Sequence, residues 1–217
     1  MDKRYLAEAV GTFCLVFAGT GAMIVDSVTG KLGLLGISVV FGVVVGVMVY
    51  SLARISGAHI NPAVTLGLAS VKRFPKKEVP YYVFFQLVGA SLASLFLFVI
   101  FGDLGRKSYF GATLVNPVFG WQIAFAMEVV MTFFLMFAIM GTTTREDIPY
   151  SVWGVAIGGT VSLDVFLGGP ISGASMNPAR TFGPSIVSGN FAFHWLYWLA
   201  PILGAVIAAL LYEYIKA

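Results

Sequence analysis

Residues 55–67 of this chain read ISGAHINPAVTLG, and the pattern returns at residues 171–183 as ISGASMNPARTFG. Nine of these thirteen aligned pairs are identical, at an offset of 116 residues. A second match, at an offset of 120, pairs residues 8–18 (EAVGTFCLVFA) with residues 128–138 (EVVMTFFLMFA), and seven of the eleven pairs agree. The chain is therefore predicted to be one domain, 1–217, built from two repeats of about 1–108 and 117–217.

The composition places these repeats in a lipid membrane. Of the 217 residues, 59% are hydrophobic and 11% are charged, whereas soluble proteins carry roughly 25% charged residues. This excludes a disordered chain and a large soluble enzyme domain, and the single Cys14 excludes a disulfide-bonded scaffold. The net charge of +3 does not indicate a nucleic acid partner, because basic residues in so apolar a chain are explained as membrane orientation signals.

Apolar runs long enough to cross a bilayer, at about 20 residues each, occur six times. They cover residues 5–25, 33–53, 80–101, 120–141, 150–167 and 193–215. Two further runs, 62–71 and 178–187, have about half that length and follow the duplicated Asn-Pro-Ala. The prediction is an all-α membrane protein with six transmembrane helices and two re-entrant half-helices.

The distribution of basic residues predicts the orientation. Six spans put both termini on one side, together with the loops near residues 75 and 145. Eight basic residues fall on that side: Lys3, Arg4, Lys72, Arg73, Lys76, Lys77, Arg145 and Lys216. Only Lys31, Arg106 and Lys107 fall on the other side, so the positive-inside rule predicts cytoplasmic termini.

Each repeat holds three spans, so the second enters the membrane from the opposite side and the repeats are inverted. Asparagine is a favoured N-cap and proline a favoured first helical residue. The motifs Asn61-Pro62-Ala63 and Asn177-Pro178-Ala179 therefore predict two short helices whose N-termini meet near the midplane. Small residues four apart, Gly42 and Gly46 in the second span and Gly154 and Gly158 in the fifth, lie at corresponding positions of the repeats and suit close helix crossing.

Two facing helix N-termini place about half a positive charge each at the membrane centre, which repels cations. If the asparagine oxygens cap the helices, the amide N–H groups of Asn61 and Asn177 point into the gap. A water molecule accepting from both turns its oxygen towards them, which interrupts a proton-conducting chain. The segments before the motifs are predicted to be extended and to line a path with backbone carbonyls, those of Gly57, Ala58, His59, Gly173 and Ser175.

Arg180 is a cation in an otherwise apolar stretch. A guanidinium facing lipid costs several kcal/mol, so we expect it to face protein or a water-filled lumen, where its charge and its donors would filter solutes. The alternative is a side chain that reaches the headgroups. The position of Arg180 directly after the second Asn-Pro-Ala favours the lumen.

The doubled Asn-Pro-Ala motif followed by Arg180 resembles the major intrinsic protein family, the aquaporins and glycerol facilitators, and the short loops resemble its microbial members. The resemblance covers essentially the whole chain. It implies a passive channel rather than an enzyme, with two half-helices completing a seventh span and a pore in each protomer of a homotetramer. It also implies a plasma-membrane location and no cofactor.

The same resemblance assigns a selectivity filter to Phe41, Val165, Ala174 and Arg180. Water-specific members have histidine where this chain has Val165, and glycerol facilitators have a second aromatic ring where it has Ala174. Thr181 and the pair Tyr197-Trp198 are similar to the aquaporins. We therefore expect a water channel with a relaxed filter that also admits small uncharged solutes such as glycerol, and the alternative is a glycerol-type facilitator.

Other polar residues in the spans have less specific interpretations. Glu8 and Glu128 occupy matched depths and are expected to accept hydrogen bonds from the re-entrant loops, a role that the resemblance also implies, with proton relay as the alternative. Asp164 is expected in the outer vestibule or at the interface. His59 is expected to be a packed, hydrogen-bonded side chain, with a pH gate as the alternative.

Two further classes of function are less well supported. The histidines, His59 and His194, and the single cysteine form no metal-binding pattern, and no catalytic set is recognisable. A secondary transporter also uses inverted repeats and broken helices. Such a protein needs acids or ion ligands at the midplane, where this chain has the neutral Asn61 and Asn177.

Overall fold

The computed structural model describes residues 2–145 and 147–216, and over this part of the chain it is helical with no strand. Six helices are long and apolar enough to cross a membrane. They are α1 (Lys3–Thr29), α2 (Gly33–Ser56), α4 (Val79–Phe101), α6 (Gly120–Thr143), α7 (Tyr150–Ser172) and α9 (Leu196–Ile215). The protein is therefore a multi-pass membrane protein, and the predicted fold class is confirmed.

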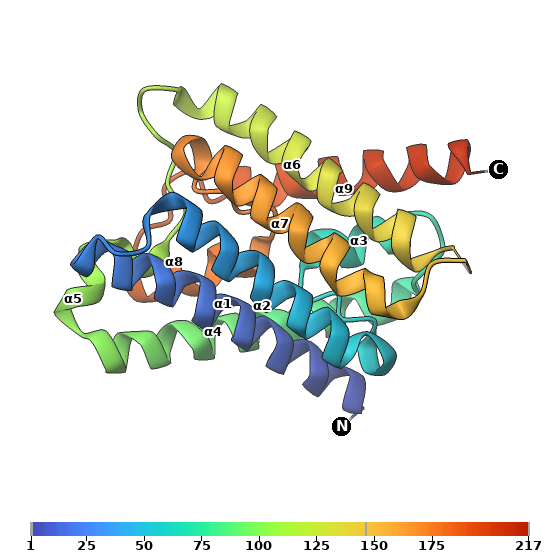
Figure 1. Ribbon diagram of the computed structural model, residues 1–217, viewed down its shortest axis with the longest axis horizontal. Helices are drawn as coiled ribbons and strands as arrows, with labels where there is room; N and C mark the ends of the chain where they lie inside the picture. Colours follow the sequence, from blue (N-terminus) through green and yellow to red (C-terminus); the bar gives the residue numbers. More distant parts are fainter. Residues whose placement is uncertain (1, 146, 217) are drawn as a thin grey trace.

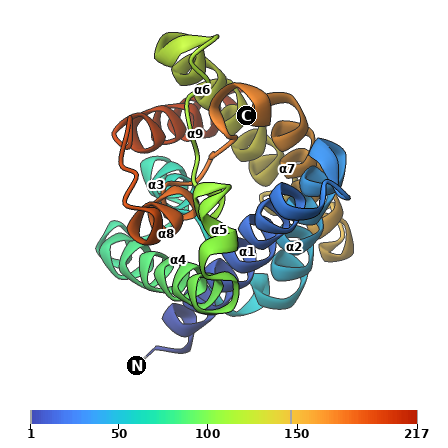
Figure 2. The same cartoon turned by 90° about the vertical axis from the view of Figure 1, so that its left-hand side faces the viewer.

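The shorter elements include both predicted half-helices. These are α3 (Pro62–Ser70) and α8 (Pro178–Ser188), accompanied by α5 (Asp103–Arg106) and the 3₁₀ turns η1 (Lys76–Glu78) and η2 (Tyr109–Gly111). The long helices run along the long axis of the molecule, α3 and α8 lie towards opposite ends, and both termini lie at the end that holds α3 (Figure 1). Seen from the end that holds α8, this helix lies in front of α3, and both are flanked by α4 and α9 (Figure 2).

Glycine contacts show that the two repeats pack alike. A Cβ on Gly89 of α4 would collide with the carbonyl oxygen of Ala9, and a Cβ on Gly204 of α9 would collide with that of Val129. The α2–α7 crossing uses the four predicted glycines: a Cβ on Gly42, Gly46, Gly154 or Gly158 would collide with the facing backbone. The absence of side chains thus lets these helices approach closely enough to position the half-helices between them.

The fifth span differs from the prediction at its C-terminal end. Instead of ending near residue 167, α7 continues through Pro170 to Ser172. A helical proline lacks one hydrogen-bond donor, so the carbonyl four residues earlier loses its helical partner. The Pro170 carbonyl is itself free because it lies in the last turn of α7, and the Asn116 side chain donates to it at 2.9 Å. The Gly-Gly-Pro sequence at 168–170 therefore forms part of the helix.

Candidate pore

Both half-helices begin at the predicted asparagines. Asn61 has an extended backbone (φ −159°), its side-chain oxygen accepts from the Ala63 N–H at 2.8 Å, and Pro62 follows as the first helical residue. Asn177 (φ −150°) accepts from the N–H groups of Ala179 at 3.0 Å and Arg180 at 3.3 Å. Each asparagine oxygen therefore faces its own helix, so its amide nitrogen is directed away from that helix.

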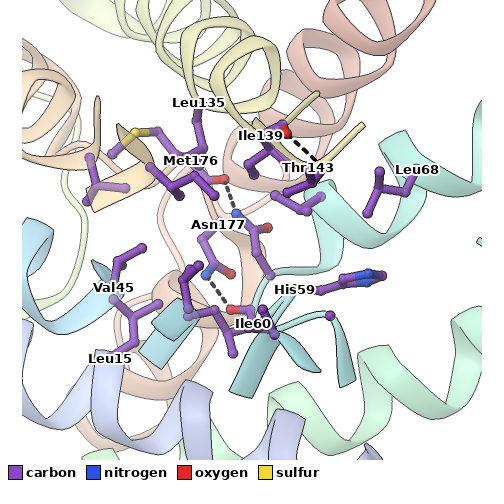
Figure 3. A pocket seen from close by; sticks show the side chains of 18 of the residues that line it. Leu15, Val45, His59, Ile60, Leu68, Leu135, Ile139, Thr143, Met176 and Asn177 are labelled. Atoms are coloured by element: carbon purple, nitrogen blue, oxygen red, sulfur yellow. Dashed lines mark hydrogen bonds between the residues drawn. The ribbon is translucent and has the colours of Figure 1, made fainter. Parts of the chain in front are cut away.

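The two asparagine amides reach across to the opposite repeat. The Asn61 amide donates to the Met176 carbonyl and the Asn177 amide donates to the Ile60 carbonyl, each at 2.8 Å (Figure 3). A primary amide has two N–H groups, so one N–H of each asparagine is used in tying the repeats together. The other N–H is the donor left for a molecule in the lumen, one from each repeat.

The loops that precede the half-helices are coiled instead of extended, contrary to the prediction. Three residues before Asn61 have left-handed backbones: Gly57 (φ 90°), Ala58 (φ 47°) and Ile60 (φ 41°). The corresponding residues Gly173 (φ 81°), Ala174 (φ 45°) and Met176 (φ 53°) repeat this. Non-glycine residues in this region cost about 1–3 kcal/mol each, so the surrounding structure must hold the loops in place.

Glu8 holds the first loop. Its carboxylate accepts from the backbone N–H groups of His59 at 2.9 Å and Ile60 at 2.6 Å, from the Ser56 hydroxyl at 2.7 Å and from the Gln86 amide at 2.7 Å. The side chain is completely buried. Since all these donors converge on one carboxylate, the left-handed backbone is fixed relative to α1.

Glu128 holds the second loop in the same way. It accepts from the N–H groups of Ser175 and Met176 and from the Ser172 hydroxyl, each at 2.7 Å. A tyrosine hydroxyl completes each support, because Tyr82 donates to the Ser56 carbonyl and Tyr197 donates to the Ser172 carbonyl. This arrangement matches the support role predicted for the two glutamates.

A cavity of about 230 Å³ extends along these loops. Residues of the two loops and of the half-helix starts line it, including Gly57, Ala58, His59, Ile60, Asn61, Ser175, Met176, Asn177 and Arg180. Aliphatic residues of the long helices also line it, including Leu15, Val45, Val49, Leu135, Ile139, Ile157 and Val161, as do the polar Arg73, Thr143 and Thr144. Gly173, predicted as a lining residue, is not part of the lining, whereas Ile60 and Met176, which were not predicted, are part of it.

Three of the four predicted filter residues, Phe41, Ala174 and Arg180, line this cavity. The Arg180 side chain is 2% exposed, its Nη1 donates to the Gly111 carbonyl at 2.7 Å, and its Cζ lies 5.0 Å from the centre of the Phe41 ring. Ala174 lines the cavity beside them. Val165 is buried in the apolar cluster that contains Phe41 and does not line the cavity. The α7 residues that line it are Trp153, Ile157 and Val161, of which Val161 lies one turn from Val165.

The model of the protein family described as "Major intrinsic protein" matches residues 1–212 of this chain. The chain belongs to the major intrinsic protein family.

Among the members of this family, a probable NIP-type aquaporin of Nicotiana alata is 43% identical over 215 residues, covering 99% of this chain and 78% of that protein. Nodulin-26 of Glycine max is 44% identical over 216 residues, with the same coverage. An X-ray structure of the aquaglyceroporin from Plasmodium falciparum superposes with a TM-score of 0.87 and 27% identity, covering 100% of this chain and 98% of that one. The similarity thus spans both repeats.

Two polar side chains of this family member lie near the pore. His59 lines the cavity, but its Nδ1 lies 3.1 Å from the Thr65 hydroxyl and its ring packs on Phe74 and Tyr82, as expected of a packed histidine. Asp164 is completely buried and neither carboxylate oxygen has a hydrogen-bond partner. It therefore lies neither in an outer vestibule nor at the interface, the two locations predicted for it.

No group of three or more potential metal ligands is present among the residues that the structure describes. The chemistry of this site rests on hydrogen bonds, helix dipoles and the Arg180 charge.

Proposed function

We propose that this protein is a passive channel that passes water and small uncharged solutes such as glycerol and excludes protons and ions. The observation that carries the proposal is the pair of crossed asparagine bonds between two half-helix N-termini, beside a cavity lined by both polar and aliphatic residues. One of the related proteins named above is a probable aquaporin, and the structural neighbour is an aquaglyceroporin.

The centre of the pore selects against charge. About half a positive charge at each half-helix N-terminus repels cations, and the remaining N–H of Asn61 and of Asn177 donates to a water molecule between them. That water is held with its oxygen towards both asparagines, so its neighbours on either side must accept from it. A proton cannot pass through because the direction of hydrogen bonding reverses there.

The remainder of the cavity suits molecules that carry both hydroxyl and hydrocarbon surface. Backbone carbonyls replace lost hydration, and the aliphatic side chains contact C–H groups without binding water tightly. Val165 and Ala174 leave the filter without the histidine of water-specific members and without a second aromatic ring. This combination supports a relaxed filter, and it is also the observation that favours the alternative, a glycerol-type facilitator.

The cellular context belongs to the same proposal. The excess of basic residues on the side of the termini favours cytoplasmic N- and C-termini, and the plasma membrane is the proposed location. The proposed assembly is a homotetramer with one pore per protomer. The protein is proposed to act without a cofactor and without catalysis.

Stopped-flow light scattering on proteoliposomes tests the function. We expect osmotic water permeability well above that of empty liposomes, with a low activation energy, and slower but measurable glycerol entry. The matched control is Phe84→Leu, which changes an exposed side chain on α4. Water permeability equal to that of empty liposomes contradicts a water channel. Fast glycerol entry with low water permeability favours the facilitator, and saturable, gradient-coupled uptake indicates a secondary transporter.

A further inference from the structure

Met23, on α1, contacts the filter arginine through its sulfur atom. The Nη2 group of Arg180 donates to Met23 Sδ at 3.2 Å, and Met23 is partly buried against the apolar cluster that contains Phe41. A thioether sulfur is a weak hydrogen-bond acceptor, and it is also polarizable enough to lie beside a cation. This residue is outside the four filter positions.

The guanidinium has five N–H groups on three nitrogen atoms, and the structure shows which of these nitrogens has a hydrogen-bond partner. Nη1 donates to the Gly111 carbonyl, Nη2 donates to Met23, and Nε has no partner. The Phe41 ring covers the guanidinium plane at 5.0 Å. Met23 therefore occupies one of the donor groups that a hydroxyl of a passing solute would otherwise use.

The repeat supports a position next to the pore lining. On α6, the row Leu135, Ile139 and Thr143 lines the cavity at four-residue spacing. An offset of 120 residues relates this row to Leu15, Gly19 and Met23 on α1. Leu15 lines the cavity, and the missing side chain of Gly19 makes room for the Phe41 ring. Met23 itself is not among the cavity-lining residues, but it lies on the same face of α1 as Leu15 and contacts Arg180, which does line the cavity.

We propose that Met23 is a positioning residue of the filter that sets its selectivity between water and polyols. Its thioether holds Nη2 of Arg180 and reduces the number of donors offered to solute hydroxyls. The inference rests on the proposed channel function and deepens it. Because Arg180 meets the solute and Met23 acts through Arg180, the effect is on the ratio of glycerol to water permeability.

Two substitutions distinguish the role of Met23 as a hydrogen-bond acceptor from its role in packing. Met23→Leu keeps a similar volume and removes the acceptor, whereas Met23→Gln keeps an acceptor at a similar distance along the side chain. Since one hydrogen bond from the guanidinium to a weak thioether acceptor is lost, we expect Met23→Leu to raise the glycerol-to-water permeability ratio about threefold. Met23→Gln is expected to retain the wild-type ratio. Met48→Leu, on a partly buried α2 methionine in the same cluster, is the matched control and should also retain it.

Both permeabilities are measured by stopped flow on the same proteoliposomes. A wild-type ratio in Met23→Leu overturns the proposal, and so does an equal change in Met23→Leu and Met23→Gln, because both results assign Met23 a packing role alone. If Met23→Leu does not reconstitute as a folded protein, Met23→Ile makes the same comparison. The wild-type arm is separate: a wild-type protein without water or glycerol permeability refutes the proposed function itself.

Discussion

The two re-entrant loops share their support and differ in what they present to the pore. In each repeat, a glutamate accepts from a serine hydroxyl and two backbone N–H groups, a tyrosine holds the serine carbonyl, and an asparagine amide crosses to the other repeat. Yet Val64 in the first repeat corresponds to Arg180 in the second. Symmetry is kept where the backbone must be held in a costly conformation, and lost at the position proposed to contact the solute.

Thr65 and Thr181 occupy equivalent positions in the two repeats, and their hydrogen-bond partners also differ. Thr65 is contacted by His59 and Gln86, and Thr181 is contacted by Ser175 and Thr113. Gln86 also gives Glu8 a fourth donor, while Glu128 has three. The first loop is therefore held by more hydrogen bonds, and the second loop carries Arg180, the proposed filter residue.

The largest effect is expected from removing the shared support. Glu8→Leu leaves four buried hydrogen-bond donors without an acceptor, and Glu128→Leu leaves three. Each unpaired donor lowers the free energy of unfolding by about 1–3 kcal/mol. We expect both variants to lose most of the folded protein, with Glu8→Leu the worse of the two. Size-exclusion chromatography and thermal unfolding in detergent measure this. Asp103→Asn, which neutralises an exposed acid, is the control.

Removing only the fourth donor sharpens the comparison between the two glutamates. Gln86→Leu should lower stability by about 1–3 kcal/mol and leave the protein folded. A variant as unstable as Glu8→Leu would show that Gln86, and not the glutamate, holds the first loop.

The second effect concerns the filter. Arg180→Val gives the second repeat the residue of the first, so it removes the charge and the donors held by Gly111, Met23 and Phe41. Losing charge-assisted hydrogen bonds of about 1.5–3 kcal/mol corresponds to roughly tenfold or more in flux. We expect glycerol permeability to rise by at least about tenfold and ion conductance across planar bilayers to appear. Conductance that stays at background contradicts the role of Arg180 in charge exclusion.

The third prediction tests which turn of α7 forms the filter. Val165→His should narrow and polarise the filter, lowering glycerol permeability severalfold while water permeability is retained. Val161→His is the paired variant, because Val161 lines the cavity and lies one turn from Val165, which does not. If only Val161→His changes the glycerol-to-water ratio in stopped flow, the assignment of Val165 is wrong.

The smallest effect is expected from Asp164, which has no acidic counterpart because its match at an offset of 116 is Met48. A buried carboxylate without partners is costly, and asparagine has nearly the same shape without the charge. Asp164→Asn should therefore stabilise the fold by about 1–3 kcal/mol, measured by thermal unfolding, with water permeability unchanged. A loss of stability would show that Asp164 has a partner in the membrane-embedded protein.

Sequence reasoning predicted the fold well because its signals are local. Hydropathy marks the six spans, and Asn-Pro starts each half-helix irrespective of its neighbours, so α3 and α8 begin where expected. The prediction of extended loops was wrong, since Ala58 and Ile60 have left-handed backbones and neither residue type favours that conformation. The aliphatic residues that line the cavity were also not predicted, because an apolar residue facing a pore looks the same in the sequence as one facing lipid.

The sequence by itself determined the duplication, the odd number of spans in each repeat and the position of Arg180, because each depends on pattern and length alone. Only the tertiary structure decided which carbonyls receive the asparagine amides, how four donors meet on Glu8, and that Met23 reaches Arg180. Those contacts join residues from 48 to 157 positions apart. Their geometry follows from helix packing, which no local pattern encodes.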